Sequence, residues 1–257
     1  MRRGSRRFMI ILALSMTPAT GYSVAQVPAA PSAAVNAPPP RFNAAPPPQR
    51  PRPPFMAQQQ QPAIEKVAPG QFRIGDILIN KKERSITFPA VTNMEKGLLE
   101  YLLVRVGGKT HESLFRTTVE PYPLQVAFLL LGYEGTDKPL ARQGDTATPK
   151  GDPVKITVTR AGADGKPEKL DYERWICKKP DKTTCETPKL EWVYTGSVVR
   201  DGRFLAQMEG SLIALYHDPV ALIDTTVGGG ESDKIWFVNE ETAPPTGTAV
   251  TITIQPN

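Results

Sequence analysis

One short segment of the sequence brings together a histidine, a carboxylate and a hydroxyl, from which a hydrolytic site could be assembled. It reads Gly108-Lys109-Thr110-His111-Glu112-Ser113-Leu114. If this is a strand, alternate side chains face opposite sides, so Glu112 points away from His111. Along such a strand, His111 and Ser113 stand roughly 6.6 Å apart, beyond hydrogen-bond reach. We therefore interpret the segment as a polar strand in which His111 and Glu112 bond to neighbouring loops, and not as a local triad.

A hydrolase that gathers its residues from distant segments is the alternative. Ser113 or Ser197 would then be the nucleophile, His111 the base and a distant aspartate the group that orients the base. The segment Thr195-Gly196-Ser197 is the second place where hydroxyls gather. We treat His111, Glu112, Ser113, Thr195 and Ser197 as one candidate polar site, either catalytic or ligand-binding.

The second histidine, His217, stands before Asp218 and Pro219. The simplest interpretation is a helix start, with Asp218 as the N-cap and Pro219 in the first turn, and catalysis by His217 is the alternative. The glycine triplet 228–230 is not followed by the Gly-Lys-Ser/Thr of a phosphate-binding loop, so we interpret it as a flexible connection.

Cys177 and Cys185 are the two cysteines of the chain. We expect them to form a disulfide that closes a charged loop, and two free thiols are the alternative. A zinc site has only His111 and His217 to complete it, and two sulfurs cannot hold an iron–sulfur cluster. We expect no cofactor.

The elements that must position these residues begin after two segments that cannot form a core. Residues 1–25 carry four arginines, then a short apolar run and the small residues Ser23 and Ala25, which is typical of a signal peptide cleaved between Ala25 and Gln26. The apolar run is shorter than the roughly 20 residues that cross a bilayer, so a retained anchor is the weaker interpretation. The chain should be exported to the periplasm, the cell surface or the medium.

Residues 26–70 hold 13 prolines in 45 residues and should be a disordered linker. It acts either as a plain spacer or as a stalk or ligand for a proline-binding partner.

The net charge is also distributed unevenly among these segments. The net charge of +5 falls to +1 without the four arginines of residues 1–25, and residues 71–257 carry a net −2. Binding of nucleic acid by the domain has therefore no electrostatic support.

Residues 71–257 should form one β-rich α+β domain with few short helices. The one clear helix is 123–131, which starts at a proline and stops at Gly132. Residues 98–106 and 109–115 should form a hairpin about Gly107-Gly108. Further strands are expected at 74–79, 85–88, 154–159, 191–194, 203–207, 211–216, 234–238 and 248–254.

Several short motifs in this domain also resemble a known family. They are Gly108-Lys109-x-His111-Glu112-Ser113, a helix that ends in Leu130-Leu131-Gly132, Trp192-Val193-Tyr194-Thr195-Gly196-Ser197, Gly210 before an apolar strand, and Pro244-Pro245-x-Gly247-Thr248-x-Val250. In order and spacing they are similar to the YdjY-like domain of exported bacterial proteins, over about residues 72 to 255. The resemblance implies the domain and no activity. We expect a noncatalytic module that binds an envelope protein or a small ligand, with the hydrolase as the alternative.

Overall fold

The structure is a computed structural model, and it describes residues 61–181 and 183–257. The predicted signal peptide, the cut between Ala25 and Gln26 and most of the predicted linker lie outside these residues. Within them, no helix is long and apolar enough to cross a membrane. Strand β1 (Glu65–Ala68) lies inside the range that we assigned to the linker, so ordered structure begins earlier than residue 71.

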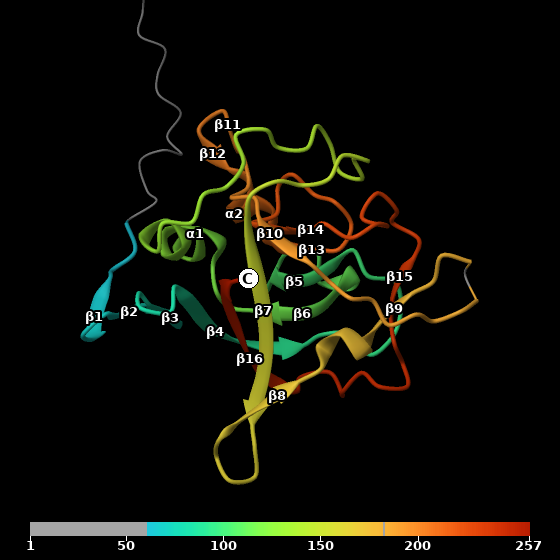
Figure 1. Cartoon of the computed structure of the whole chain (residues 1–257), viewed down its shortest axis with the longest axis horizontal. Coiled ribbons are helices and arrows are strands. Elements are labelled where there is room, and N and C mark those ends of the chain that lie inside the picture. The colour runs from blue at the N-terminus through green and yellow to red at the C-terminus, as the bar shows by residue number, and fades with distance from the viewer. Residues whose placement is uncertain (1–60, 182) are drawn as a thin grey trace, which may run out of the picture. The chain divides into compact units, whose positions relative to one another are not determined.

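The centre of the molecule is an eight-stranded barrel of mixed strand direction (Figure 1). Seven strand pairs follow one another around it, and pairing of β6 with β4 closes the ring. In spatial order the strands are β4 (Ser85–Thr92), β16 (Ala249–Pro256), β7 (Asp152–Ala161), β10 (Trp192–Tyr194), β14 (Ile223–Thr225), β13 (Ser211–Ala214), β5 (Tyr101–Arg105) and β6 (Ser113–Thr117).

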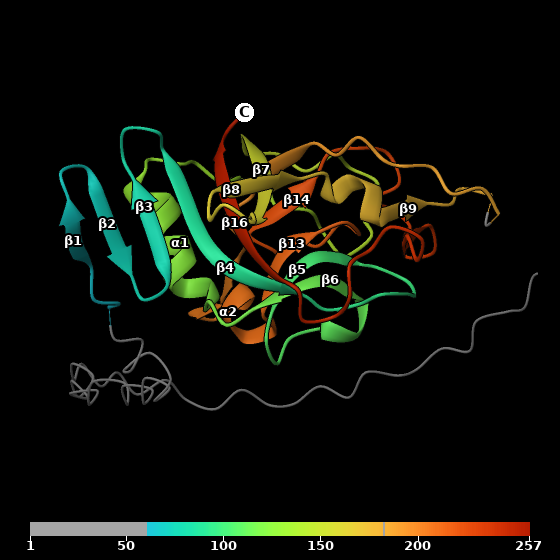
Figure 2. The same ribbon diagram turned by 90° about the horizontal axis from the view of Figure 1, so that it is seen from below.

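The long strand β4 joins the barrel to a small antiparallel extension. Its first half pairs with β3 (Ile77–Asn80), which continues through β2 (Gln71–Ile74) to β1, and its second half pairs with β6. Figure 2 shows this extension to one side of the barrel. The smaller strands are β8 (Pro167–Leu170), β9 (Ile176–Lys178), β11 (Val199–Arg200), β12 (Arg203–Phe204) and β15 (Trp236–Val238).

The core consists of large side chains from the strands and from helix α1 (Pro121–Leu130). Helix α1 begins at Pro121, two residues before the predicted start at Pro123, and Gly132 at φ +71° lies just past its end as predicted. Leu124 and Phe128 point inward, and the Phe128 ring stacks on Tyr194 of β10 with centroids 4.3 Å apart. Aromatic packing of this kind fixes α1 against the barrel.

Four of the expected elements differ in the structure. The segment 74–79 is divided by a turn at Gly75, which has φ +54°. The segment 203–207 is strand only to Phe204, and continues as the short helix α2 (Leu205–Glu209). No helix follows Asp218, because residues 223–225 form β14, parallel to β13. The expected hairpin 98–115 is also wrong: β5 and β6 are parallel neighbours, joined through a 3₁₀ helix at Thr110–Glu112.

Candidate functional site

The 3₁₀ helix changes the geometry of the segment from which the sequence analysis started. His111 and Glu112 are on adjacent positions of one helical turn, and Nε2 of His111 lies 3.5 Å from Oε2 of Glu112. The expectation that Glu112 points away from His111 is therefore wrong. The His111 side chain is 78% exposed and that of Glu112 only 16%, so the carboxylate is the more buried of the two.

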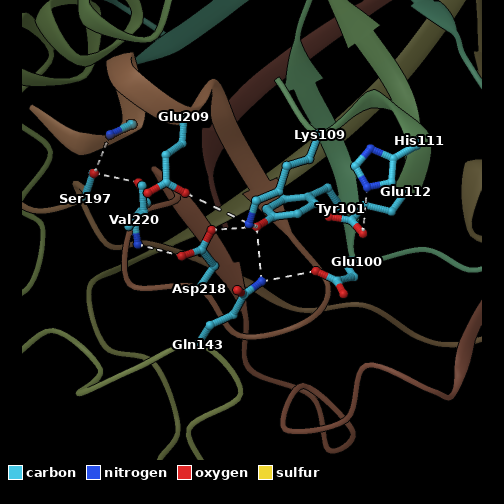
Figure 3. Close-up of polar contacts among 11 residues, drawn as sticks. Glu100, Tyr101, Lys109, His111, Glu112, Gln143, Ser197, Glu209, Asp218 and Val220 are labelled. Carbon is cyan, nitrogen blue, oxygen red and sulfur yellow. Dashed lines mark hydrogen bonds and ion pairs between the residues drawn. The ribbon is translucent and has the colours of Figure 1, made fainter. Parts of the chain in front are cut away.

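The hydroxyls of the candidate site are bonded to main-chain carbonyls. Ser113 is fully buried, and its Oγ donates to the Phe115 carbonyl at 2.7 Å. Thr195 Oγ1 donates to the Ala221 carbonyl at 2.9 Å. Ser197 Oγ donates to the Val220 carbonyl at 2.5 Å. In the part of the chain that the structure describes, no hydrogen bond joins His111 to a serine, and Figure 3 shows Ser197 on the far side of the site from His111. The five predicted residues thus form two separate groups.

Between these two groups lies a polar network that the sequence analysis did not identify (Figure 3). Its centre is the hydroxyl of Tyr101, a fully buried residue of β5. This hydroxyl donates to Asp218 Oδ2 at 2.7 Å and accepts from Lys109 Nζ at 2.7 Å and from Gln143 Nε2 at 3.3 Å. The Lys109 ammonium also lies 3.9 Å from a carboxylate oxygen of Glu209.

The loop after β13 supplies the acidic end of the network. Asp218 accepts the N–H of Val220 on Oδ1 at 2.9 Å, and its own N–H donates to Oδ2 of Asp224 at 2.8 Å. Burial raises the pKa of Asp224 well above its ordinary value, and burial beside Asp218 likewise raises the pKa of Tyr101. Tyr101 is therefore held neutral, with its proton directed at Asp218.

A second pair of acids lies at the outer end of the network. Gln143 Nε2 donates to Oε2 of Glu100 at 3.1 Å, and the Glu100 N–H donates to the Glu112 carbonyl at 2.8 Å. Burial raises the pKa of Glu100 to about 7, with the Glu112 carboxylate as the second cause, and Lys109 opposes the increase. The two carboxyl groups thus share less than two negative charges near neutral pH.

Two motif glycines explain how the lysine reaches this site. A methyl carbon at Gly108 would lie 2.9 Å from the Glu209 carbonyl oxygen and 3.3 Å from Cα of Gly210, which itself has φ +75°. Only a residue without a side chain allows this approach. The contact brings the start of the 3₁₀ helix against the end of α2, and so places Lys109 beside Glu209 and over the Tyr101 ring, 5.0 Å from its centroid.

The second histidine and the cysteines have structural contacts. His217 is buried, and its Nδ1 donates to the Asp145 carbonyl at 2.7 Å, while Nε2 faces Gly230. Cys177 and Cys185 form the predicted disulfide, with Cα atoms 4.9 Å apart. Across residues 61–181 and 183–257, no group of three histidine, cysteine or acidic side chains is arranged to hold a metal ion.

Tyr101, Gln143, Asp218 and Asp224 were missed as a group for identifiable reasons. Tyr101 stands in an apolar run and looks like a core residue, and Gln143 lies in a loop with no motif around it. Asp218 was considered as a helix cap or as the acid of a hydrolase site, and not as the partner of a tyrosine. The one usable signal was Lys109, a charged residue directly after Gly107-Gly108, but Glu209 and Asp218 join it and Tyr101 from parts of the chain about 100 residues away.

The fold and this site define an eight-stranded mixed β-barrel domain with a buried pair, Tyr101 and Asp218. A carboxyl pair, Glu100 and Glu112, lies at the outer end of the polar network, and we call it the rim site. A family model described as the YdjY domain matches residues 77–255. The chain therefore belongs to the YdjY domain family, in agreement with the resemblance of its motifs. Searches of the curated proteins and of the solved structures returned no match.

Proposed function

We propose that the protein is an exported binding module whose rim site takes a ligand that carries a cationic nitrogen. Export is supported by the signal-like residues 1–25, which we expect to be cleaved after Ala25, and by the disulfide, which is typical of oxidising compartments. The proline-rich residues 26–60 would serve as the tether between the domain and the surface on which it works.

The observation that carries the proposal is the carboxyl pair Glu100 and Glu112. Its members are partly buried, and the pKa of Glu100 is raised to about 7 because burial and a second carboxylate disfavour its charge. An ammonium or guanidinium group placed between them would restore the charged form of Glu100, which is a gain that a neutral ligand cannot provide. Gln143 and the exposed His111 add hydrogen-bonding groups at the rim.

Binding explains the network better than the hydrolase alternative does. The serine hydrolase considered as the alternative needs a hydroxyl nucleophile within reach of a base, whereas Ser113 and Ser197 donate to main-chain carbonyls. Tyr101 is held neutral by burial and by Asp218, so it is a poor proton acceptor. The Tyr101–Asp218 pair instead helps to position the rim site, because the Tyr101 hydroxyl accepts hydrogen bonds from Lys109 and Gln143.

A titration with a matched pair of small probes tests the proposal. N-acetyl-lysinamide and its uncharged analogue N-acetyl-norleucinamide would be added to the ¹⁵N-labelled protein at pH 8, with amide shifts as the measurement. We expect saturable shifts at Glu100, Glu112 and Gln143 with the charged probe only, and at least tenfold weaker binding at pH 5.5, where Glu100 is protonated.

The double variant Glu100→Gln, Glu112→Gln should remove this binding. The matched control is Glu240→Gln, at an exposed carboxylate outside the network, which should bind the probe like the parent. Equal shifts with both probes, or binding that survives in the double variant, would contradict the proposed site.

A further inference from the structure

Residues 136–150 form a compact loop whose two ends meet on the barrel wall (yellow-green in Figure 1). A glycine at each end is packed against the main chain at the end of β10. A methyl carbon at Gly135 would lie 2.5 Å from the Thr195 carbonyl oxygen, and one at Gly151 would overlap the Tyr194 carbonyl oxygen. Loops with adjacent ends are packed by their own side chains and frequently have a function.

A small cavity lies between this loop and the barrel wall. From the wall it is lined by Asp224 of β14 and by the hydroxyl residues Thr195 and Ser197, and from the loop by residues that include Pro139 and Pro149. It leaves about 10 Å³ for the centre of a water-sized sphere. That is room for one water and not for a larger ligand.

Asp224 brings an unpartnered polar atom to this cavity. The residue is fully buried, and its Oδ2 accepts the N–H of Asp218 at 2.8 Å. Its Oδ1 has no hydrogen-bond partner among the described residues. Nearly all buried polar atoms of folded proteins are bonded, and internal waters supply the partners that the chain does not. A buried oxygen of this kind, on a residue that lines a water-sized cavity, indicates a water site.

The hydrogen-bonding roles around the cavity also suit a water. Burial raises the pKa of Asp224 well above its ordinary value, so its carboxyl group is protonated. Because Oδ2 accepts a hydrogen bond, the proton belongs on Oδ1, which is then a donor. Thr195 Oγ1 donates its own proton to the Ala221 carbonyl, and this leaves its lone pairs to accept. A water can accept from the first group and donate to the second.

We infer that one buried water occupies this cavity, accepts from Asp224 Oδ1 and donates to Thr195 Oγ1. Its second hydrogen is available to a main-chain carbonyl of the loop. The water thereby fastens residues 136–150 to the barrel wall, and with them Gln143, which donates to Glu100 (Figure 3). The inference does not depend on which ligand the rim site takes.

A sodium ion is an occupant of similar size, and it fits this cavity less well. A protonated Asp224 carries no charge to attract a cation. The loop side of the cavity is lined by Lys138 and Lys150, whose ammonium groups repel one. The structure therefore favours the water.

A crystal structure at a resolution that shows ordered waters tests the occupant. Crystals of the purified chain would be grown in sodium chloride and in rubidium chloride, because rubidium scatters anomalously. We expect one water within hydrogen-bond distance of Asp224 Oδ1 and Thr195 Oγ1 in both salts, without anomalous signal. Empty density at this place, or a rubidium peak there, would overturn the inference.

Hydrogen exchange in solution tests whether the water holds the loop. Asp224→Asn keeps an acceptor for the Asp218 N–H and a donor toward the cavity, so it should behave like the parent. Asp224→Leu removes both groups and fills the space. In that variant we expect the Thr136 amide, which donates to the Thr195 carbonyl at 3.0 Å, to exchange about tenfold faster.

The amides that pair β16 with β7 serve as the internal reference, because they report opening of the whole barrel. The faster exchange of Thr136 should remain after correction for them. If Thr136 exchanges equally in Asp224→Leu and Asp224→Asn after this correction, the water does not hold the loop and the inference fails.

Discussion

At the scale of single residues, the molecule depends on polar groups that sit in the barrel wall with their partners. Tyr101 and Asp218 are both buried, and each supplies what the other lacks, a donor and an acceptor. A buried polar group that loses its partner costs more than the bond itself is worth. The loss of unfolding free energy on removing the Tyr101 hydroxyl therefore measures how much this hydrogen-bonded pair stabilises the fold.

We expect Tyr101→Phe to lower the free energy of unfolding by about 1–3 kcal/mol, because Asp218 loses its tyrosine donor while it remains buried. Urea unfolding followed by tryptophan fluorescence measures it. The control is Tyr122→Phe, since no hydrogen bond of the Tyr122 hydroxyl is found in the described chain and that residue is only half-buried. Equal stability of Tyr101→Phe and the parent protein would refute the role of the pair.

The raised pKa of Glu100 predicts that the free energy of unfolding depends on pH. Its pKa is raised from 4.5 to about 7 in the folded chain, so between these values the folded state binds more protons than the unfolded state. This contribution to stability is fully present below the unfolded pKa and is lost as the pH rises through about 7. We expect Glu100→Gln to lose less stability than the parent between pH 5 and pH 8 in urea unfolding. If the two proteins follow the same pH curve, Glu100 is not protonated in the folded state as proposed.

Residue types alone drew attention to His111 and Glu112, which lie beside this network, but not to Lys109. The disulfide was predicted correctly because two cysteines in a chain expected to be exported leave few alternatives. The partners of Lys109 were not predictable, since Tyr101 looks like any core aromatic until the loop that carries Asp218 is placed beside it. Contacts between segments about 100 residues apart leave no local pattern in a single sequence.

At the scale of elements, the residues that start and end each element determined which elements could be predicted from the sequence. Helix α1 was predicted because proline at its start and Gly132 past its end act locally, although the start was placed at Pro123 and lies at Pro121. Gly107-Gly108 suggested a hairpin for an equally local reason. The structure uses Gly108 instead for a close approach to Glu209, and β6 runs parallel to β5. Glycine suits both a tight turn and a close approach of two backbones, and only the tertiary contact shows which role Gly108 has.

We expect Gly108→Ala to destabilise the fold by about 1–3 kcal/mol, because the new methyl group would meet the main chain at Glu209 and Gly210. It should also displace Lys109 and so shift the amide resonances around Tyr101. Gly228→Ala is the matched control, since a methyl group there meets nothing within 4 Å and the backbone is not left-handed. Similar urea midpoints for the two variants would show that the close approach at Gly108 is not needed.

At the scale of the whole molecule, closure of the barrel was beyond sequence reasoning. The pattern predicted a β-rich domain with few helices, and this class is correct. The ring closes because β4 is long enough to pair with β3 in its first half and β6 in its second. That arrangement depends on strand register over long distances, which hydrophobic alternation within each strand does not specify.

The disulfide contributes to stability by constraining the loop 177–185 in the unfolded chain. The double variant Cys177→Ser, Cys185→Ser should lose about 2.5 kcal/mol of unfolding free energy by the loop-entropy model. The parent protein treated with reductant should show the same loss, whereas reductant should leave the double variant unchanged. Two alkylatable thiols in protein isolated under non-reducing conditions would contradict the disulfide and would weaken the argument for export.

The boundary between tether and domain gives the last prediction. Strand β1 pairs with β2 from Glu65 onward, so the folded unit includes it, whereas residues 26–60 are composed like a linker and should add no core. A chain that begins at Gln61 should therefore unfold at the same urea concentration as one that begins at Gln26. A chain that begins at Gln71 loses the β1 ladder, and should be less stable by about 1–2 kcal/mol, since each lost main-chain hydrogen bond contributes roughly 0.5–1.5 kcal/mol. A large loss on removing residues 26–60 alone would show that the proline-rich segment packs on the barrel and is not a free tether.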